Sequence, residues 1–326
     1  MKAVRIHQYG GPEVLVYEDV PTPEPGPGQI LVRIEAATVN PVDVAVREDR
    51  FPTPKAPPKT LGSDGAGVVE QVGHDVSSVK PGDAVFFSGL GVGSEGSYAE
   101  FALIAEVQAV PIPAGLTFVD AAALGMAFPA AYYGLVTRGG VQAGEKVLVQ
   151  GAAGGVGSAS VQLAVALGAR VVGTVNGAAE AELVRSLGAE ATIDYRTEDV
   201  VSRALELTGG AGPDLVHELV VSVNLPADVR LLATGGRIVC TGQGPSPEGT
   251  VPIGDALAKD ATLLFMNLNN AKRAGVAAIA REVAQMAADG RVKPVIGEEL
   301  PLAQARRAHE LLAGDHLGKI VLLPRS

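Results

Sequence analysis

The chain has almost no cysteine, and this scarcity excludes several kinds of site. Cys240 is the only cysteine among 326 residues, so an intrachain disulfide, a zinc site of several cysteines and an iron-sulfur cluster are all excluded. The first 20 residues lack the apolar core of a secretion signal. No stretch holds the roughly 20 uninterrupted apolar residues that predict a transmembrane helix. We therefore expect a cytoplasmic protein that does not enter membranes.

Positive charge is also scarce. The chain carries 26 Lys and Arg against 36 Asp and Glu, a net charge of −10, which disfavours binding to nucleic acid or to an anionic membrane. Hydrophobic residues make up 47% and charged residues 19%, a composition too apolar for a disordered chain. The length predicts about two domains, because one hydrophobic core stops growing near 250 to 300 residues.

The first third of the chain is typical of a small β-rich domain. Its prolines crowd into residues 21–28 and 51–58, and turn signals such as KPGD at 80–83 separate short apolar runs. Four such runs predict strands: 29–37, 65–73, 83–87 and 97–104.

A strand, a glycine-rich turn and a helix follow one another in the middle of the chain. Residues 146–150 are an apolar strand, and residues 151–157 read Gly-Ala-Ala-Gly-Gly-Val-Gly before a helical pattern. Ala152, Gly154 and Gly157 occupy the three small positions of the G-x-G-x-x-G pattern. Small residues there allow the turn, the approach of a pyrophosphate and the contact of helix with sheet. The alternative is a tight glycine turn without a ligand.

Strands and helices then alternate to about residue 266. Five further strands are predicted, at 169–175, 191–195, 213–220, 235–242 and 261–266. This alternation predicts an α/β fold with a doubly wound parallel sheet, a Rossmann domain over 124–266, and a ligand at the carboxyl ends of the strands.

The end of the second strand of this domain decides which dinucleotide is favoured. A carboxylate there would accept the ribose hydroxyl of NAD, whereas Asn176 is neutral and does not repel the extra phosphate of NADP. Four side chains are candidate contacts of that phosphate: Arg185, Tyr195, Arg196 and Lys319. Glu180 is acidic and close in sequence, which would disfavour that phosphate. NADPH is therefore favoured, and NADH is left open.

A resemblance to a known family is carried by seven segments: MKAVRIHQYGGPEVL at 1–15, ILVRIEAATVNPVD at 30–43, LGSDGAGVVEQVG at 61–73, KPGDAV at 80–85, GSYAEFALI at 96–104, VLVQGAAGGVGSASVQLAVALGARVVGTV at 147–175 and HLGKIVLL at 316–323. On these residues the chain resembles the zinc-independent medium-chain dehydrogenases/reductases of the quinone oxidoreductase, zeta-crystallin-like, group. The resemblance implies a GroES-like β-rich catalytic domain over 1–123 and 267–326, the Rossmann domain over 124–266, and a cleft that holds NADPH. It also implies a homodimer joined through the sheet edge at 261–267.

The resemblance also implies individual site residues. The implied cofactor contacts are Asn40, Ala152, Gly154, Gly155, Val156, Gly157, Asn176, Tyr195, Gly242, Phe265, Asn267 and Lys319. Asn40 is implied to lie beside the nicotinamide, where its amide would donate to a substrate carbonyl; capping a turn before Pro41 is the alternative. Asp43 is a second catalytic candidate that would equally serve as a helix cap. Lys319 is either a cofactor contact or a surface lysine.

The residues argue against a metal. Asn40 stands where zinc-dependent relatives have a cysteine, and Ser63 and Asp64 stand where they have histidine and glutamate. The five histidines are scattered: His7, His74, His217, His309 and His316. Without a metal, the predicted reaction is hydride transfer from NADPH to a small acceptor that is already electrophilic, a quinone or an α,β-unsaturated carbonyl compound.

Several departures from the family pattern leave the substrate open. Ala45 and the segment 49–51 stand where family members often carry tyrosines, Glu180 replaces a common lysine, and Ala130 replaces a common threonine. Two alternatives therefore remain. One is an enoyl-thioester reductase, and the other is an NADPH-binding sensor or structural protein with little turnover.

Overall fold

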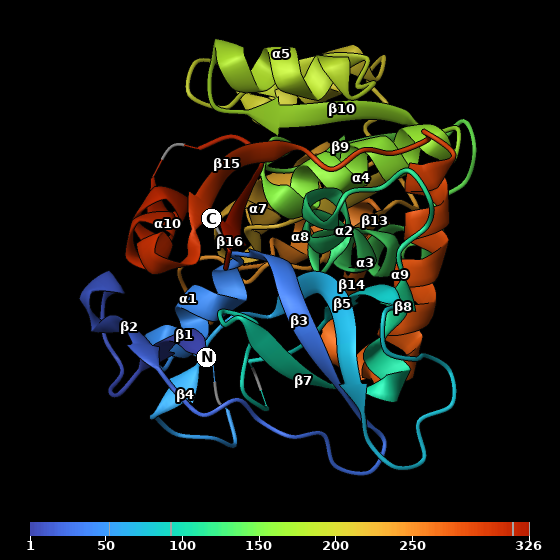
Figure 1. Ribbon diagram of the computed structural model, residues 1–326. Helices are drawn as coiled ribbons and strands as arrows, with labels where there is room; N and C mark the ends of the chain where they lie inside the picture. Colours follow the sequence, from blue (N-terminus) through green and yellow to red (C-terminus); the bar gives the residue numbers. More distant parts are fainter. Residues whose placement is uncertain (52, 92, 315, 326) are drawn as a thin grey trace. The chain divides into compact units, whose positions relative to one another are not determined.

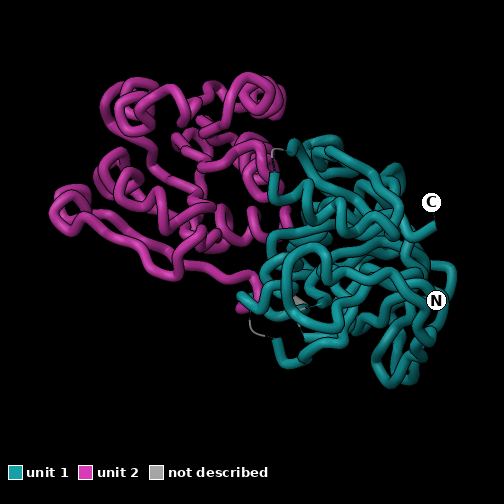
Figure 2. The backbone as a smooth tube through the Cα atoms, turned by 90° about the vertical axis from the view of Figure 1, so that its left-hand side faces the viewer, with its two compact units in different colours: residues 1–126, 271–326 teal, residues 127–270 magenta. Residues whose placement is uncertain are grey.

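Two units of the chain fold around separate cores. In the computed structural model, unit 1 comprises residues 1–126 and 271–326, and unit 2 comprises residues 127–270 (Figure 2). Both chain ends therefore belong to unit 1. The sequence placed the two boundaries after residues 123 and 266. The structure describes residues 1–51, 53–91, 93–314 and 316–325.

Unit 1 is built on a sheet whose strands come from both ends of the chain. Among the described residues this sheet has the strand order β15-β16-β3-β5-β6-β8, with β7 paired to β3, and a smaller sheet has the order β2-β1-β4. Strands β1 to β8 and β15 to β16 are Lys2–Ile6, Leu15–Asp19, Gln29–Thr38, Lys59–Thr60, Asp64–Val72, Ala84–Ser88, Phe101–Ala105, Val110–Pro111, Ile296–Pro301 and Lys319–Leu323. The strand predicted at 97–104 begins later, because the backbone of Ser97 and Tyr98 bonds to Gly62 and Leu61 in a neighbouring loop.

Alternation along β3 creates the core of unit 1. Ile30, Val32 and Ile34 are buried in one cluster with Phe87 of β6 and Leu322 of β16, as expected for a strand whose every second side chain faces the core. Four α-helices accompany the sheets in the described part of this unit: α1 (Pro41–Arg47), α2 (Phe118–Leu124), α9 (Lys272–Ala288) and α10 (Ala305–Ala313). Helix α9 is the long orange helix in Figure 1.

Strand pairing in unit 1 gathers residues that are far apart in the sequence. Thr38, the last residue of β3, lies opposite Asp64 of β5 and opposite Val321 of β16. The segment after β3 therefore starts beside the first residues of β5 and β16. A cluster of buried polar side chains lies at this end of the sheet.

Unit 2 is an α/β unit with a wholly parallel sheet. The strand order is β11-β10-β9-β12-β13-β14, and each neighbouring pair is parallel. The strands are β9 (Lys146–Val149), β10 (Arg170–Val175), β11 (Ala191–Asp194), β12 (Leu215–Glu218), β13 (Arg237–Cys240) and β14 (Thr262–Phe265). This is the order of a doubly wound dinucleotide-binding fold. The predicted α/β fold is confirmed.

Short apolar strands and their crossover helices form the core of unit 2. Leu148, Val216 and Ile238 of three central strands share one buried cluster, as expected for a sheet covered on both faces. The described helices are α3 (Ala127–Tyr132), which continues as a π-helix over Tyr133–Arg138, α4 (Gly155–Ala166), α5 (Ala178–Ser186), α6 (Val200–Leu207), α7 (Val221–Leu231) and α8 (Ile253–Ala258). Helix α5 contacts β10 and β11, and Figure 1 shows it beside β10.

Among the residues that the structure describes, one helical stretch is long and apolar enough to cross a membrane by length and composition alone. It spans Phe118–Arg138, and 67% of its most apolar window is buried within the protein. Gly125 and Met126 interrupt it between α2 and α3. Burial of this kind is typical of a core helix.

Candidate functional site

The glycine turn of unit 2 connects β9 to the first turn of α4. Gly151 has a φ of +59°, a left-handed conformation that glycine adopts at little cost. A Cβ at Gly157 would overlap the carbonyl oxygen of Gly151, whereas a Cβ at Gly154 would meet only that oxygen, at 3.5 Å. Gly157 is therefore required by the packing of the turn itself, and Gly154 leaves the exposed side of the turn open.

This turn has the properties of a phosphate-binding site. Helix α4 has 12 residues, begins directly after Gly154 and has no acidic side chain in its first turn. Its free backbone N–H groups and the positive end of its dipole attract anions. Ala152 is fully buried, and a Cβ at Gly173 of β10 would lie 2.6 Å from its methyl group. Its side chain therefore packs on β10, and only its backbone is left to contact a ligand.

The ends of the neighbouring strands β10 and β11 carry three of the predicted nucleotide residues: Asn176, Tyr195 and Arg196. Asn176 follows β10; its Oδ1 accepts a hydrogen bond from Arg196 Nη1 at 3.0 Å, and its backbone N–H donates to Glu180 Oε2 at 2.6 Å. The Tyr195 side chain is 52% exposed. Arg185, another candidate for a phosphate contact, donates instead to Thr192 Oγ1 at 2.9 Å. Arg196 is therefore the guanidinium that lies at Asn176.

The other predicted residues of unit 2 lie at the carboxyl ends of β13 and β14. Gly242 follows β13, and a Cβ there would overlap the carbonyl oxygen of Leu219, so close backbone contact requires this glycine. Phe265 ends β14 and is 62% exposed. Asn267 is exposed, and its Oδ1 accepts a hydrogen bond from the backbone N–H of Asn269 at 3.0 Å. Their roles in cofactor binding remain predictions.

Unit 1 holds a buried polar cluster, the Asn40 cluster, defined here as Thr38, Asn40, Asp43, Ser63, Asp64, Tyr98 and Lys319. All seven are at most 7% exposed. Asn40 is its centre. Its Nδ2 donates to Asp64 Oδ2 at 2.8 Å and to Ser63 Oγ at 3.0 Å. Because both amide hydrogens have acceptors, donation from Asn40 to a substrate carbonyl would require one of these bonds to be exchanged.

Lys319 supplies the positive charge of the cluster. Its Nζ donates to Asn40 Oδ1 at 2.5 Å and to the carbonyl oxygen of Val39 at 3.3 Å. Its third N–H has no acceptor among the described residues. Burial lowers the pKa of Lys319, and the charges of Asp64 and Asp43 oppose that change. The alternative of a surface lysine is therefore wrong, because the side chain is buried where β16 pairs with β3.

Asp43 acts as a cap of α1, the alternative left open by the sequence. Its Oδ2 accepts hydrogen bonds from the backbone N–H of Asn40 at 2.9 Å and from the Tyr98 hydroxyl at 3.1 Å. Burial raises the pKa of Asp43 to about 7, and the charge of Asp64 adds to the rise. Burial also raises the pKa of Tyr98. Whether Asp43 takes part in catalysis remains a prediction.

Sequence reasoning missed part of the Asn40 cluster. Asp64 was considered only as a stand-in for a metal ligand, yet its Oδ2 accepts hydrogen bonds from Asn40 Nδ2, Thr38 Oγ1 at 3.0 Å and the backbone N–H of Met126 at 2.9 Å. Its Oδ1 is buried without a partner among the described residues. A charged residue at the start of an apolar strand was the available signal. Tyr98 gave no comparable signal.

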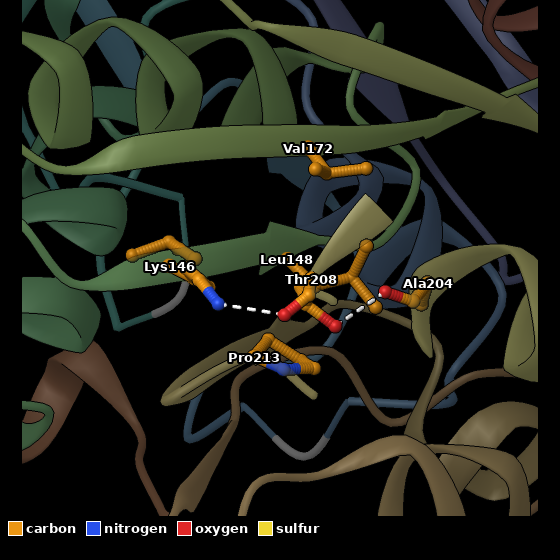
Figure 3. A pocket seen from close by; sticks show the side chains of 7 residues that line it. Lys146, Leu148, Val172, Ala204, Thr208 and Pro213 are labelled. Atoms are coloured by element: carbon orange, nitrogen blue, oxygen red, sulfur yellow. Dashed lines mark hydrogen bonds between the residues drawn. The ribbon is translucent and has the colours of Figure 1, made fainter. Parts of the chain in front are cut away.

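A small cavity in unit 2 is not part of either site. It lies near the amino-terminal ends of β9 and β12, and Figure 3 shows six of its lining residues with labels. The Lys146 Nζ donates to the carbonyl oxygen of Thr208 at 2.7 Å, and the Thr208 hydroxyl donates to the carbonyl oxygen of Ala204 at 2.7 Å. The remaining lining is mostly aliphatic. The cavity is therefore away from the carboxyl ends of the strands, where a doubly wound sheet binds its ligand.

Comparison with known proteins agrees with both units. The sequence profile of the alcohol dehydrogenase GroES-like domain matches residues 26–114, and that of the zinc-binding dehydrogenases matches residues 155–285. The quinone oxidoreductase of Rattus norvegicus is 37% identical over 99% of this chain and 98% of its own length. These similarities define a medium-chain NAD(P)H-dependent oxidoreductase. Within that class, the chain belongs to the quinone oxidoreductase family.

Solved structures show the same relationship. The quinone oxidoreductase of Escherichia coli in complex with NADPH has a TM-score of 0.90 and 30% identity, over 99% of this chain and 100% of that chain. An NAD-dependent alcohol dehydrogenase has a TM-score of 0.92 and 32% identity, over 99% of each chain. The resemblance inferred from the sequence is confirmed, and so is the prediction that the protein is an enzyme.

The residues of the Asn40 cluster do not fit the zinc ion that the name of one matching profile suggests. The Asn40 Oδ1 is bound to an ammonium group, which would repel a metal cation. Ser63 Oγ and Asp64 Oδ2 already accept hydrogen bonds from the Asn40 amide. In the described part of the chain, no group of three or more His, Cys, Asp or Glu side chains is arranged to hold a metal ion.

Proposed function

We propose that this enzyme uses NADPH to transfer a hydride to a small electrophilic acceptor, a quinone or an α,β-unsaturated carbonyl compound. The observation that carries the proposal is the glycine turn, whose open side at Gly154 leads directly into α4. In this proposal the backbone N–H groups of residues 155–157 hold the pyrophosphate, and Gly154 gives it room to approach. The nicotinamide supplies the hydride chemistry when it is bound.

Arg196 supports the preference for NADPH over NADH. Its guanidinium lies at Asn176, where a neutral side chain ends β10, and a guanidinium binds a phosphate in a bidentate manner. Glu180 is the opposing charge, but its carboxylate accepts a hydrogen bond from the backbone of Asn176. We infer that Arg196 contacts the 2′-phosphate of NADPH and that Glu180 limits the size of the preference.

The Asn40 cluster is proposed to bind and polarise the carbonyl group of the acceptor. Lys319 carries an N–H that no described residue accepts, and Asn40 holds the ammonium in place through Oδ1. Such a donor stabilises the oxyanion that develops as the acceptor is reduced. Asp43 and Asp64 keep the buried amine next to negative charge. An acceptor that is already electrophilic needs no stronger Lewis acid.

We further propose that two copies of the chain associate through β14, an edge strand of the parallel sheet. Phe265 of β14 is 62% exposed, and Ile253 and Leu257 of α8 are 65% and 74% exposed. Exposed apolar side chains next to an open strand edge favour pairing with another strand. Leu257→Asp combined with Phe265→Asp should shift the mass measured by sedimentation to that of a monomer; a wild-type monomer would contradict the proposal.

The other proposed properties follow from composition. The acidic chain is proposed to bind neither nucleic acid nor membranes. A cytoplasmic location is proposed because the single cysteine, Cys240, is free and proteins of the reducing cytoplasm rarely contain disulfides.

The proposal is tested by following the oxidation of NADPH, and separately of NADH, with a small quinone, an enone and crotonyl-coenzyme A as acceptors. We expect turnover with the quinone or the enone, and faster turnover with NADPH. Turnover confined to crotonyl-coenzyme A would identify an enoyl-thioester reductase instead. Tight NADPH binding without turnover would support a sensor or structural protein.

A further inference from the structure

Two buried carboxyl groups face each other in unit 2, and neither belongs to the site described above. Glu218 is the last residue of β12, and Asp228 lies in α7. Both are 0% exposed, and the two side chains lie close enough for a protonated carboxyl group on one to donate to the other. We refer to Glu218 and Asp228 as the acid pair.

A hydrogen bond between two carboxyl groups requires a proton on one of them. Glu218 Oε2 and Asp228 Oδ2 are both buried and have no other partner among the described residues. Two ionised carboxylates at such a site would repel each other strongly and would leave both oxygens without a donor. Burial raises the pKa of Asp228, and Glu218 adds to the rise. Asp228 therefore keeps its proton under conditions in which exposed carboxyl groups have lost theirs.

The acid pair is connected to the glycine turn through three hydrogen bonds. Gln150 Nε2 donates to Asp228 Oδ1 at 2.7 Å, and Thr174 Oγ1 donates to Gln150 Oε1 at 2.8 Å. Thr174 Oγ1 in turn accepts a hydrogen bond from the backbone N–H of Gly151 at 2.9 Å. Gly151 is the first residue of the turn, so this network joins the acid pair to the backbone that is proposed to bind the pyrophosphate.

The opposite side of the pair is fixed to the loop after β12. The backbone N–H of Val220 and Nδ2 of Asn224 both donate to Glu218 Oε1. Glu218 therefore stays in place, and the proton keeps Asp228 beside it. The amide, hydroxyl and backbone groups of this network keep their hydrogens at neutral and mildly alkaline pH. Only the proton of the acid pair can be lost.

The surroundings of the acid pair contain no cation that could replace the proton. No described Lys or Arg forms an ion pair with Glu218 or Asp228, and the charged groups acting on Asp228 are limited to Glu218. Cys240 of β13 is a thiol rather than a cation, and its pKa is raised to about 12 by burial and by the charges of Glu218 and Asp228. His217, the preceding residue of β12, bonds instead to Ser160 and Thr241. From α7, Arg230 pairs with Asp255 on the surface. Gln150, which follows β9, and Thr174 of β10 carry no charge.

We propose that Glu218 and Asp228 share one proton, that this proton positions the glycine turn through Gln150 and Thr174, and that loss of the proton weakens nucleotide binding. Both are positioning residues, because neither touches the nucleotide. The proposal rests on the proposed nucleotide-binding function. When the proton leaves, the two carboxylates repel each other and Gln150 loses its fixed acceptor. The Gly151 end of the turn then loses its anchor.

Amide substitutions test the shared proton directly. In Asp228→Asn the new Oδ1 still accepts from Gln150, and the new Nδ2 donates to Glu218 Oε2 in place of the proton. Glu218→Gln achieves the same from the other side and serves if the first variant does not fold. The double variant Glu218→Gln/Asp228→Asn places two NH₂ groups against each other. The matched control is Asp214→Asn, since Asp214 lies just before β12, at the other end of the same strand, where it accepts from the backbone of Lys146.

The main readout is the dissociation constant of NADPH, followed by its fluorescence between pH 7 and pH 10. For the wild type and for Asp214→Asn we expect affinity to fall by up to about tenfold per pH unit above the midpoint of the pair. Each single amide variant should bind with an affinity that is nearly independent of pH. The double variant should bind at least about tenfold more weakly at every pH, as expected when a buried polar group loses its partner. Wild-type pH dependence in both single variants, or tight binding by the double variant, would overturn the proposal.

A second readout separates this proposal from the proposed function. Without any nucleotide, the urea midpoint of the wild type should fall with rising pH relative to that of Asp228→Asn, because the folded wild type holds a proton that the unfolded chain releases above pH ~4. A chain that shows this difference but binds no NADPH would contradict the proposed function and leave the shared proton intact. Equal slopes in the two proteins would refute the shared proton itself.

Discussion

The glycine turn of unit 2 and the Asn40 cluster of unit 1 are built in opposite ways. The turn is made by seven consecutive residues whose function depends on their backbone, at positions 151–157. The cluster is made by side chains from β3, the start of α1, β5 and the residue before it, β16 and the segment before β7, brought together by strand pairing. A change in the turn should therefore act through local geometry, and a change in the cluster should act through charge and hydrogen bonding.

The largest effect is expected from Gly157→Val. A Cβ at this position would overlap the Gly151 carbonyl oxygen, so the turn cannot keep its shape, and we expect NADPH binding to weaken by more than about 100-fold. The measurement is a fluorescence titration with NADPH, together with thermal unfolding of the variant. Unit 1 should remain folded.

Gly154→Ala is the matched control for this prediction. The added methyl group finds room in the protein, with its nearest neighbour at 3.5 Å, and the backbone φ of −69° suits alanine. The protein should keep its stability, and any loss of affinity then reports contact with the ligand. Normal NADPH binding by both variants would show that the turn does not hold the nucleotide.

The next largest effect is expected from Lys319→Met in the Asn40 cluster. Methionine fills a similar volume but cannot donate to Asn40 Oδ1 or to an acceptor, and we expect kcat to fall about 100-fold, the usual cost of removing one oxyanion donor. The measurement is steady-state kinetics with a quinone at saturating NADPH.

Lys59→Met distinguishes a role in the reaction from the general cost of replacing a buried lysine. Lys59 is 0% exposed, against 7% for Lys319, and lies in unit 1, but its Nζ donates to Thr53 Oγ1, which is not part of the cluster. This variant should lose stability without a comparable fall in kcat. Equal losses of kcat in the two variants would contradict the assignment of Lys319.

The sequence predicted the glycine turn better than the Asn40 cluster, because the turn is local and the cluster is not. The turn, its strand and its helix could be predicted because small residues, apolar runs and helical spacing are local properties, and all six strands of the sheet were located. The family resemblance then named Asn40 and Lys319 without their mutual contact. That contact depends on the pairing of Val321 with Thr38, across more than 280 positions, and no local pattern encodes such a register. The bonds that occupy the Asn40 amide, and the roles of Asp64 and Tyr98, were unpredictable for the same reason.

A smaller, pH-dependent effect is expected from Asp43. Its pKa is raised to about 7 by burial, so the folded protein holds a proton that the unfolded chain releases above pH ~4. Its contribution to stability is therefore complete below pH ~4 and is lost as the pH rises to about 7. Relative to Asp43→Asn, the wild type should lose up to about 1.4 kcal/mol of unfolding free energy per pH unit in this range. Urea unfolding at intervals between pH 4 and pH 8 measures the difference, and parallel curves would contradict the raised pKa.

The smallest effect is expected at the end of β10, where the site again depends on side chains although its residues are close in sequence. Arg196→Gln should lower the ratio of kcat/KM for NADPH to that for NADH by about tenfold, because one charge-assisted contact to the phosphate is lost. Glu180→Gln should raise the same ratio severalfold, since it removes a negative charge near Asn176. The two variants should therefore change the NADPH-to-NADH ratio in opposite directions.

Arg185→Gln decides whether these changes are specific contacts or effects of net charge. It removes the same charge from the same unit, but its guanidinium donates to Thr192 Oγ1 rather than to Asn176. Surface charges act on a bound phosphate only weakly beyond a Debye length of about 10 Å, so the nucleotide ratio of this variant should stay close to that of the wild type. A drop equal to that of Arg196→Gln would show that the preference comes from the general field of unit 2. The end of β10 would then resemble the glycine turn, with selectivity set by backbone and field, and the contrast between the two kinds of site would be confined to the Asn40 cluster.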